Sequence, residues 1–266
     1  NKVPGKIVLA PRGEFSPGAL GLKSNKKSLY IHLSKILNLY KNIKWHATAE
    51  TERKDIESVF GNEINVLVAR NLTGIYKNLK YERNIEKRKN ELNIVFISRI
   101  HPKKNLKKAL DFLRTLTGKI NFSIYGPIED KTYWQECKEI INELPKTIKV
   151  SYKGVVNHDK VVSVFKSHHV FLFPTLGENF GHVIFESLIS GCPVIISNQT
   201  PWRNLEIMQV GWDIDLSNEN KFISTLQNCL DMDNEKYELI SKNAFYYGIK
   251  IANETSDVAN TNRLFQ

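Results

Sequence analysis

The sequence predicts an α/β protein built on a doubly wound parallel sheet over residues 93–245. Short apolar runs alternate with helix-like segments throughout this region. The runs show little alternation of polar and apolar residues, which is typical of parallel strands buried on both faces. Strands that alternate with helices favour right-handed crossovers within one parallel sheet.

The expected elements of this region follow one another in a regular order. Strands are predicted at 93–98, 120–125, 148–152, 170–174 and 193–197. Helices are predicted between them at 105–116, 131–144, 158–166 and 182–190. Ligands of such sheets bind beyond the carboxyl ends of the strands, so we look for functional residues there.

For residues 1–92 we predict a smaller, partial α/β domain followed by a linker. Strands are expected at 7–10, 46–49 and 65–69, and helices at 29–38 and 51–60. The segment 79–91 is dense in charge and is interpreted as a solvated connection. Residues 246–266 are expected to form a C-terminal helix that packs back toward the N-terminal part.

The composition is that of an ordinary globular protein. Of 266 residues, 41% are hydrophobic and 25% are charged, which allows a real core. No apolar run approaches the ~20 residues that span a bilayer, and we identify no signal peptide. The cysteines Cys137, Cys192 and Cys229 are far apart and odd in number, which favours buried thiols in a reducing compartment. We therefore predict a cytoplasmic protein.

The net charge of +10 favours anionic partners. No basic stretch is interleaved with stacking aromatics, so we expect no nucleic-acid binding. A weak attraction to anionic lipid is the better interpretation, with peripheral contact at the inner membrane face.

The first candidate site follows the strand 93–98. Arg99 and Lys104 flank the start of the next helix, where free backbone N–H groups favour an anion. A guanidinium fork and an ammonium group together suit a diphosphate. The alternative is a pair of ordinary surface cations on a loop.

The second candidate site follows the strand 170–174. Glu178 lies in a glycine-containing loop, and Glu186 lies on the helix after it, with seven residues between them. Carboxylates at strand ends suit the hydroxyl groups of a sugar or ribose. Gly181 allows the backbone to approach a ligand closely. The alternative is a pair of solvated glutamates.

These segments resemble motifs of glycosyltransferase family 4. The second segment, GENFGHVIFESLISGCPV, looks like the family's E-x(7)-E motif. The first, SRIHPKKN, looks like its G-R-x(4)-K motif, with Ser98 where glycine is usual. Further similarity lies at 10–20, 46–52 and 201–216, in the family's order. The resemblance implies the GT-B architecture, in which two Rossmann-like domains flank the active site.

The resemblance also implies roles for single residues. Arg99, Lys104 and Glu178 are the implied catalytic residues: the cations bind the leaving diphosphate, and Glu178 contacts hydroxyls of the donor sugar. Glu186 holds the ribose. The other implied donor-binding residues are Phe180, Gly181, His182, Tyr125, Gly126, Gly154 and Val155.

The implied activity is retaining transfer of a glycosyl unit from a nucleotide-diphosphate sugar to an acceptor hydroxyl. The acceptor is expected to be a polysaccharide, a glycan or a lipid-linked molecule. No metal and no cofactor are expected, because Arg99 and Lys104 stabilise the leaving group. The D-x-D pairs Asp213/Asp215 and Asp231/Asp233 are short and common by chance, so they do not favour a metal site.

Residues 1–92 are expected to be a remnant of the acceptor-side domain that lacks its first strands. This leaves a second hypothesis open: a nucleotide-sugar-binding module or partner subunit without turnover. A phosphorylase or an inverting transferase on the same fold is a further alternative. The sugar, the base, the acceptor, the linkage and the oligomeric state stay open.

Overall fold

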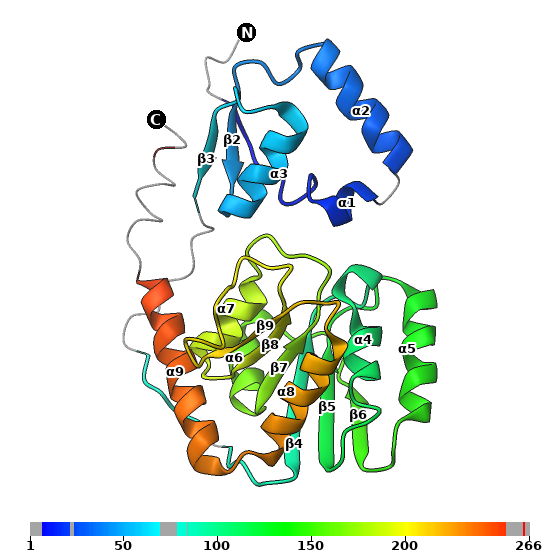
Figure 1. Ribbon diagram of the computed structural model, residues 1–266, viewed down its shortest axis with the longest axis vertical. Helices are drawn as coiled ribbons and strands as arrows, with labels where there is room; N and C mark the ends of the chain where they lie inside the picture. Colours follow the sequence, from blue (N-terminus) through cyan, green and yellow to red (C-terminus); the bar gives the residue numbers. More distant parts are fainter. Residues whose placement is uncertain (1–6, 22–23, 70–78, 84, 254–262, 264–266) are drawn as a thin grey trace. The chain divides into compact units, whose positions relative to one another are not determined.

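The computed structural model describes residues 7–21, 24–69, 79–83, 85–253 and 263. The chain forms two compact units (Figure 1). Among the described residues, the first unit holds 7–21, 24–69, 177–180 and 263. The second unit holds the remainder, 79–83, 85–176 and 181–253. The structure therefore places residues 79–83 and 85–92 in the second unit, whereas the sequence predicted them as part of the segment 1–92.

The second unit contains a six-stranded parallel sheet in the order β6-β5-β4-β7-β8-β9. Its strands are β4 (Glu91–Ile97), β5 (Lys119–Tyr125), β6 (Ile148–Tyr152), β7 (Val170–Phe173), β8 (Val194–Ser197) and β9 (Gly211–Ile214). This confirms the predicted doubly wound fold. Strand β9 was not predicted, because the polar Asp213 interrupts a run of only four residues.

Helices connect the strands from β4 to β8 in the predicted alternation, and two further helices, which were not predicted at these positions, follow β9 (Figure 1). They are η1 (Pro102–Lys104), α4 (Leu106–Asp111), α5 (Lys131–Glu143), α6 (His158–Lys166), α7 (His182–Ile189), α8 (Glu219–Asp231) and α9 (Asn234–Ala252). The predicted helix 105–116 is shorter than expected. Asn105 adopts a left-handed conformation (φ 60°), which separates a 3-10 turn from the α-helix. Most of the predicted C-terminal segment 246–266 lies outside the described residues beyond α9.

The core of the second unit lies along β7 and β8, which are buried at every position. The rings of Phe171 and Phe173 stack with centroids 5.2 Å apart, and Phe165 meets Phe171 edge-on at 5.2 Å. Burial on both faces is what the unbroken apolar runs predicted.

The charged segment before β4 packs against the second unit instead of lying fully in solvent. Lys87 is 2% exposed, and its Nζ donates to the carbonyls of Leu230 (2.9 Å) and Met232 (3.0 Å). Arg83 donates to the carbonyls of Gly191 and His168. The interpretation as a solvated connection is wrong for these two side chains, because each satisfies backbone carbonyls that burial would leave unpaired.

The first unit has a three-stranded parallel sheet in the order β1-β2-β3. Its elements are β1 (Val8–Leu9), α1 (Pro17–Gly21), α2 (Ser24–Ile36), β2 (Lys44–Ala47), α3 (Glu50–Phe60) and β3 (Val66–Val68). The three strands and two longer helices were predicted, with bounds shifted by a few residues. Only the short α1 was missed.

A small aromatic cluster around Trp45 fills the core of the first unit. Trp45, Ala47 and Ile56 are fully buried. The rings of Phe60 and Tyr40 lie 4.8 Å and 5.2 Å from that of Trp45. Across the described parts of both units, no helix combines the length and the apolar character that crossing a bilayer requires.

Candidate active site

The strand order of the second unit reverses between β4 and β7. Strands β5 and β6 continue on one side of this pair, and β8 and β9 continue on the other. In open parallel sheets, ligands bind at the carboxyl ends of the strands where such a reversal occurs. Both sequence-predicted segments, the one after β4 and the one after β7, leave the sheet at this point.

Hydrogen bonds join the segments that follow β4 and β7. The N–H of Leu176 donates to the carbonyl of Lys103 (2.9 Å), and Asn105 Nδ2 donates to the carbonyl of Pro174 (2.9 Å). The hydroxyl of Thr175 also donates to the Lys103 carbonyl (3.2 Å). The structure therefore brings the predicted cation-bearing turn beside the end of β7.

The two predicted phosphate-binding cations differ in environment. The side chain of Arg99 is 54% exposed, and its Nη1 donates to both carboxylate oxygens of Glu129 (2.7 Å and 3.0 Å). Lys104 is 8% exposed, and its Nζ lies 5.7 Å from the centroid of the Phe173 ring. Lys104 is therefore buried near the end of β7, whereas Arg99 is half exposed beside Glu129.

Local turn chemistry fixes the cation-bearing segment. His101 precedes the turn in an extended conformation, and its Nδ1 accepts from the N–H of Lys103 (3.1 Å). Pro102 begins the turn, and left-handed Asn105 ends it. This arrangement directs the chain back into α4 directly after Lys104.

Gly126 and Gly154, two of the implied donor-binding residues, lie at neighbouring strand ends. Gly126 has φ +134°, and a Cβ there would lie 1.8 Å from the carbonyl oxygen of Ser98. Its N–H donates to the carbonyl of Gly154 (2.8 Å). Tyr125 precedes Gly126, and burial raises the pKa of its hydroxyl. Val155 follows Gly154 and is 67% exposed. The ends of β4, β5 and β6 therefore lie close together, with the exposed side chain of Val155 beside them.

Helix α7 carries the predicted ribose ligand. Gly181 is buried and left-handed (φ +74°) at the N-cap, and the exposed His182 begins the helix. Glu186 lies one turn further, with its side chain 13% exposed and its Oε1 3.3 Å from Nδ1 of His158. Burial raises the pKa of Glu186, and the charge of protonated His158 lowers it. Burial therefore favours the protonated form of the Glu186 carboxyl group.

Glu178 and Phe180 lie in the segment Gly177–Phe180, which belongs with the first unit. Phe180 is buried, and Glu178 is half-buried. Their predicted roles at the donor sugar stay predictions.

A buried carboxylate that sequence reasoning missed organises the first unit. Glu52 is 3% exposed and accepts from the N–H of Gly13 (2.7 Å) and from the N–H and hydroxyl of Thr48 (2.7 Å and 2.6 Å). Asn179, beside Glu178, also donates to it (3.3 Å). A Cβ on Gly13 would meet the side chain of Asn179 at 1.9 Å. The only signal was the position of Glu52 inside the family-like segment 46–52.

The sequence also did not predict two partners of the candidate residues. Glu129 accepts hydrogen bonds from Arg99, and His158 lies beside the carboxylate of Glu186. Both partners follow strand ends, after β5 and after β6, and that position was the available signal. Neither could be assigned because each pair joins segments about 30 residues apart.

The aspartate pairs have structural roles. Asp213 accepts from the N–H groups of Asn204 and Leu205, and Asp215 accepts from Ser217. Asp233 caps α9. Among the described residues, no group of three His, Cys, Asp or Glu side chains could hold a metal ion. The three cysteines are buried and free, as predicted.

Comparison with known proteins identifies the class of protein that this fold and site define. The model of the family described as Glycosyl transferases group 1 matches residues 78–245. The match covers more than half of the chain, and the chain belongs to this family. No curated protein matches the sequence.

Similar solved structures share the fold at low sequence identity. A Staphylococcus aureus TarM mutant, in complex with fondaparinux, α-GlcNAc-glycerol and UDP, aligns with TM-score 0.68 and 19% identity over 84% of this chain and 44% of TarM. Anabaena HepE, in complex with UDP and glucose, aligns with TM-score 0.72 and 15% identity over 96% of this chain and 72% of HepE. A Rickettsia africae glycosyltransferase aligns with TM-score 0.68 and 15% identity over 84% of this chain and 62% of its own. The chain thus spans less than half the length of TarM.

Proposed function

We propose that this protein is a retaining glycosyltransferase of family 4. It moves a glycosyl unit from a nucleotide-diphosphate sugar to an acceptor hydroxyl on a polysaccharide, glycan or lipid-linked molecule. The observation that carries the proposal is the position of Arg99 and Lys104 at the switch point between β4 and β7. UDP and glucose in the HepE structure and UDP in the TarM structure support a nucleotide-sugar donor.

The chemistry follows from the charge that develops on the leaving group. Cleavage of the bond between the sugar and the nucleoside diphosphate leaves negative charge on the diphosphate. Preorganised donors that meet such charge lower the barrier, each by roughly 3–4 kcal/mol. Arg99 and Lys104 would supply two of them, and the diphosphate would compete with Glu129 for Arg99. Glu186 would accept from the ribose hydroxyls, and Glu178 from those of the donor sugar.

A nucleotide titration tests the donor site. We expect UDP or GDP to raise the melting temperature of the wild-type protein with concentration. Arg99→Ala should weaken binding about tenfold, because a charge-assisted hydrogen bond contributes roughly 1.5–3 kcal/mol. Arg114→Ala is the matched control, since Arg114 is also partly exposed and pairs with Glu143 (2.8 Å) at a different place. Equal nucleotide binding by the two variants would contradict the proposed site.

A second measurement separates transfer from binding alone. Release of free nucleotide from the donor sugar that binds, followed by NMR of the glycosyl product, reports turnover and anomeric configuration. A product of retained configuration supports the proposal. An inverted product would contradict the retaining mechanism, and binding without turnover would identify the chain as a binding module.

A further inference from the structure

The two carboxyl oxygens of Glu52 bind different parts of the chain. Glu52 lies in the first turn of α3 and is 3% exposed. Its Oε2 accepts from the N–H and the hydroxyl of Thr48, at 2.7 Å and 2.6 Å. Its Oε1 accepts from the N–H of Gly13 at 2.7 Å and from Nδ2 of Asn179 at 3.3 Å. One side chain therefore joins three segments of the first unit.

Helix capping accounts for only one of these oxygens. Glu52 is the third residue of α3, and a glutamate at this position commonly accepts from an N–H group just before the helix. The contact between Oε2 and Thr48 is of this kind. The donors of Oε1 serve no helix end, because Gly13 and Asn179 are 39 and 127 residues away in the sequence. The second oxygen therefore has a separate role, which is to hold these two segments.

Gly13 and Asn179 are also packed tightly against each other. Gly13 is left-handed (φ +81°), and a Cβ there would lie 1.9 Å from Oδ1 of Asn179 and 2.7 Å from its Cγ. Glycine at this position allows the side-chain amide to lie directly against the backbone. The amide of Asn179 is thus fixed on one side by its hydrogen bond to Glu52 and on the other by the backbone of Gly13.

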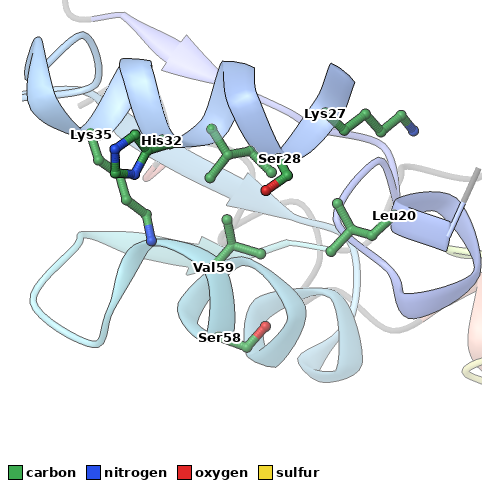
Figure 2. A pocket seen from close by; sticks show the side chains of 8 residues that line it. Leu20, Lys27, Ser28, His32, Lys35, Ser58 and Val59 are labelled. Atoms are coloured by element: carbon green, nitrogen blue, oxygen red, sulfur yellow. The ribbon is translucent and has the colours of Figure 1, made fainter. Parts of the chain in front are cut away.

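These contacts lie at the carboxyl ends of strands of the first unit. Thr48 directly follows β2, and Gly13 lies in the turn that follows β1. The other end of α3 is different: Figure 2 shows Val59 pointing toward α2 across a groove of about 470 Å³. None of the described residues that line this groove is a candidate site residue. The first turn of α3, not its open end, is therefore connected to the candidate site.

Asn179 is the neighbour of Glu178 in the segment Gly177–Phe180, which belongs with the first unit and forms no helix or strand. Consecutive Cα atoms are about 3.8 Å apart, so a shift of the backbone at Asn179 also moves Glu178. We propose that Glu52 is a positioning residue that acts through Asn179 and holds Glu178 in the orientation that the donor sugar requires. This inference rests on the proposed function, in which Glu178 accepts from hydroxyls of that sugar.

Asn179→Ala tests the contact with the least disturbance, because Glu52 keeps its hydrogen bonds to Gly13 and Thr48. The measured rate is nucleotide release from UDP-glucose or GDP-mannose, whichever binds the wild-type protein. We expect kcat to fall at least about tenfold, since a misplacement of about 1 Å costs up to about 100-fold. The Kd of free UDP or GDP should stay at the wild-type value, because no residue of the implied diphosphate or ribose site is changed.

Two control variants separate positioning from stability. Asn121 is also partly buried and donates one side-chain hydrogen bond, to Asn93 (2.9 Å), so Asn121→Ala should keep the wild-type kcat. Thr48→Val removes one donor to Oε2 and should lower the melting temperature without lowering kcat. A loss of kcat in Thr48→Val as large as that in Asn179→Ala would assign both effects to stability and overturn the proposal.

A double-mutant cycle tests whether Glu52 acts through Asn179. Glu52→Ala should lower kcat at least about tenfold, and the double variant with Asn179→Ala should be no slower than the slower single variant. Gly13→Ala displaces Asn179 by a second route and should also lower kcat. Melting temperatures show which variants fold, and the Gly13 and Asn179 variants decide the proposal if Glu52→Ala does not fold.

The outcomes distinguish this proposal from the proposed function. Wild-type protein that releases no nucleotide would overturn both. Wild-type release that Asn179→Ala leaves unchanged would overturn the positioning role alone, and so would effects of Glu52→Ala and Asn179→Ala that multiply in the double variant. Weaker binding of free nucleotide by Asn179→Ala would show a general loss of the donor site and would also overturn the positioning role.

Discussion

Strands β7 and β8 of the second unit are buried along their whole length, whereas the strands of the first unit are only partly covered. β7 and β8 are buried at every position, but β1 and β3 have no buried residue. Both units alternate strands with helices. Six strands with helices around them enclose a core, while three strands leave apolar residues such as those of α2 exposed.

The largest expected effect on stability comes from a buried side chain of the second unit, which is compared with an exposed side chain of the first. Phe171 is fully buried and packs on two phenylalanine rings, so Phe171→Ala should lower the free energy of unfolding by about 3–5 kcal/mol. Leu33→Ala, at an exposed position of α2, should lower it by less than about 0.5 kcal/mol. Urea unfolding measures both. A similar loss in the two variants would mean that the side chain of Leu33 also packs within the folded chain, which would contradict the comparison.

A titratable group in the core of the second unit gives the next largest effect. His169 is 2% exposed, and its Nδ1 accepts from the N–H of Asn93 (2.9 Å), which requires an unprotonated ring. Burial lowers its pKa from 6.5 to about 4. Between these values the unfolded chain binds a proton that the folded chain does not. The free energy of unfolding should therefore fall, by up to about 3 kcal/mol, as the pH drops from 6.5 toward 4.

The variant His169→Gln tests the assignment of this pH dependence. It should be less stable than wild type at neutral pH but lose less stability on acidification. His32→Gln, at an exposed position of α2, is the control and should keep the wild-type slope. An unchanged slope in His169→Gln would place the acid sensitivity elsewhere.

In the first unit, polar contacts replace part of the stabilisation that the second unit obtains from its core. Glu52→Gln cannot accept from the N–H of Gly13 and from both donors of Thr48 as a carboxylate does. We expect a loss of roughly 1–3 kcal/mol. Glu50→Gln, an exposed residue of the same helix that pairs with Arg53, should change stability by less than about 0.5 kcal/mol. Faster hydrogen exchange at the amides of Gly13 and Thr48 in the Glu52 variant alone would support the comparison, and equal exchange would contradict it.

The sequence predicted the fold well where one local pattern decided the outcome. Unbroken apolar runs located β7 and β8, and α7 was predicted directly after the glycine-containing loop. The spacing of apolar residues predicted α2 but could not tell which side it would bury. Partners such as Glu129 and His158 were missed because tertiary folding, not local sequence, brings them to Arg99 and Glu186. The motif residues of the second unit were located because strand ends converge at a switch point in any doubly wound sheet.

The smallest effect concerns Glu186, where stability and binding are expected to change in opposite directions. Burial raises the pKa of Glu186 above its value in the unfolded chain. In the window above that unfolded value, the folded chain holds a proton that the unfolded chain has released, so stability falls as the pH rises. Glu186→Gln removes this dependence and should raise the free energy of unfolding at pH 7 by less than about 1 kcal/mol. Nucleotide binding should nevertheless weaken, because the amide offers one oxygen to the ribose where the carboxylate offers two. Urea unfolding at pH 5 and pH 8, both above the ordinary glutamate pKa of 4.5, measures the stability, with Glu143→Gln as an exposed control. A variant less stable than wild type at pH 8 would show that the ionised carboxylate of Glu186 is stabilised within the folded chain and needs no ligand to satisfy it.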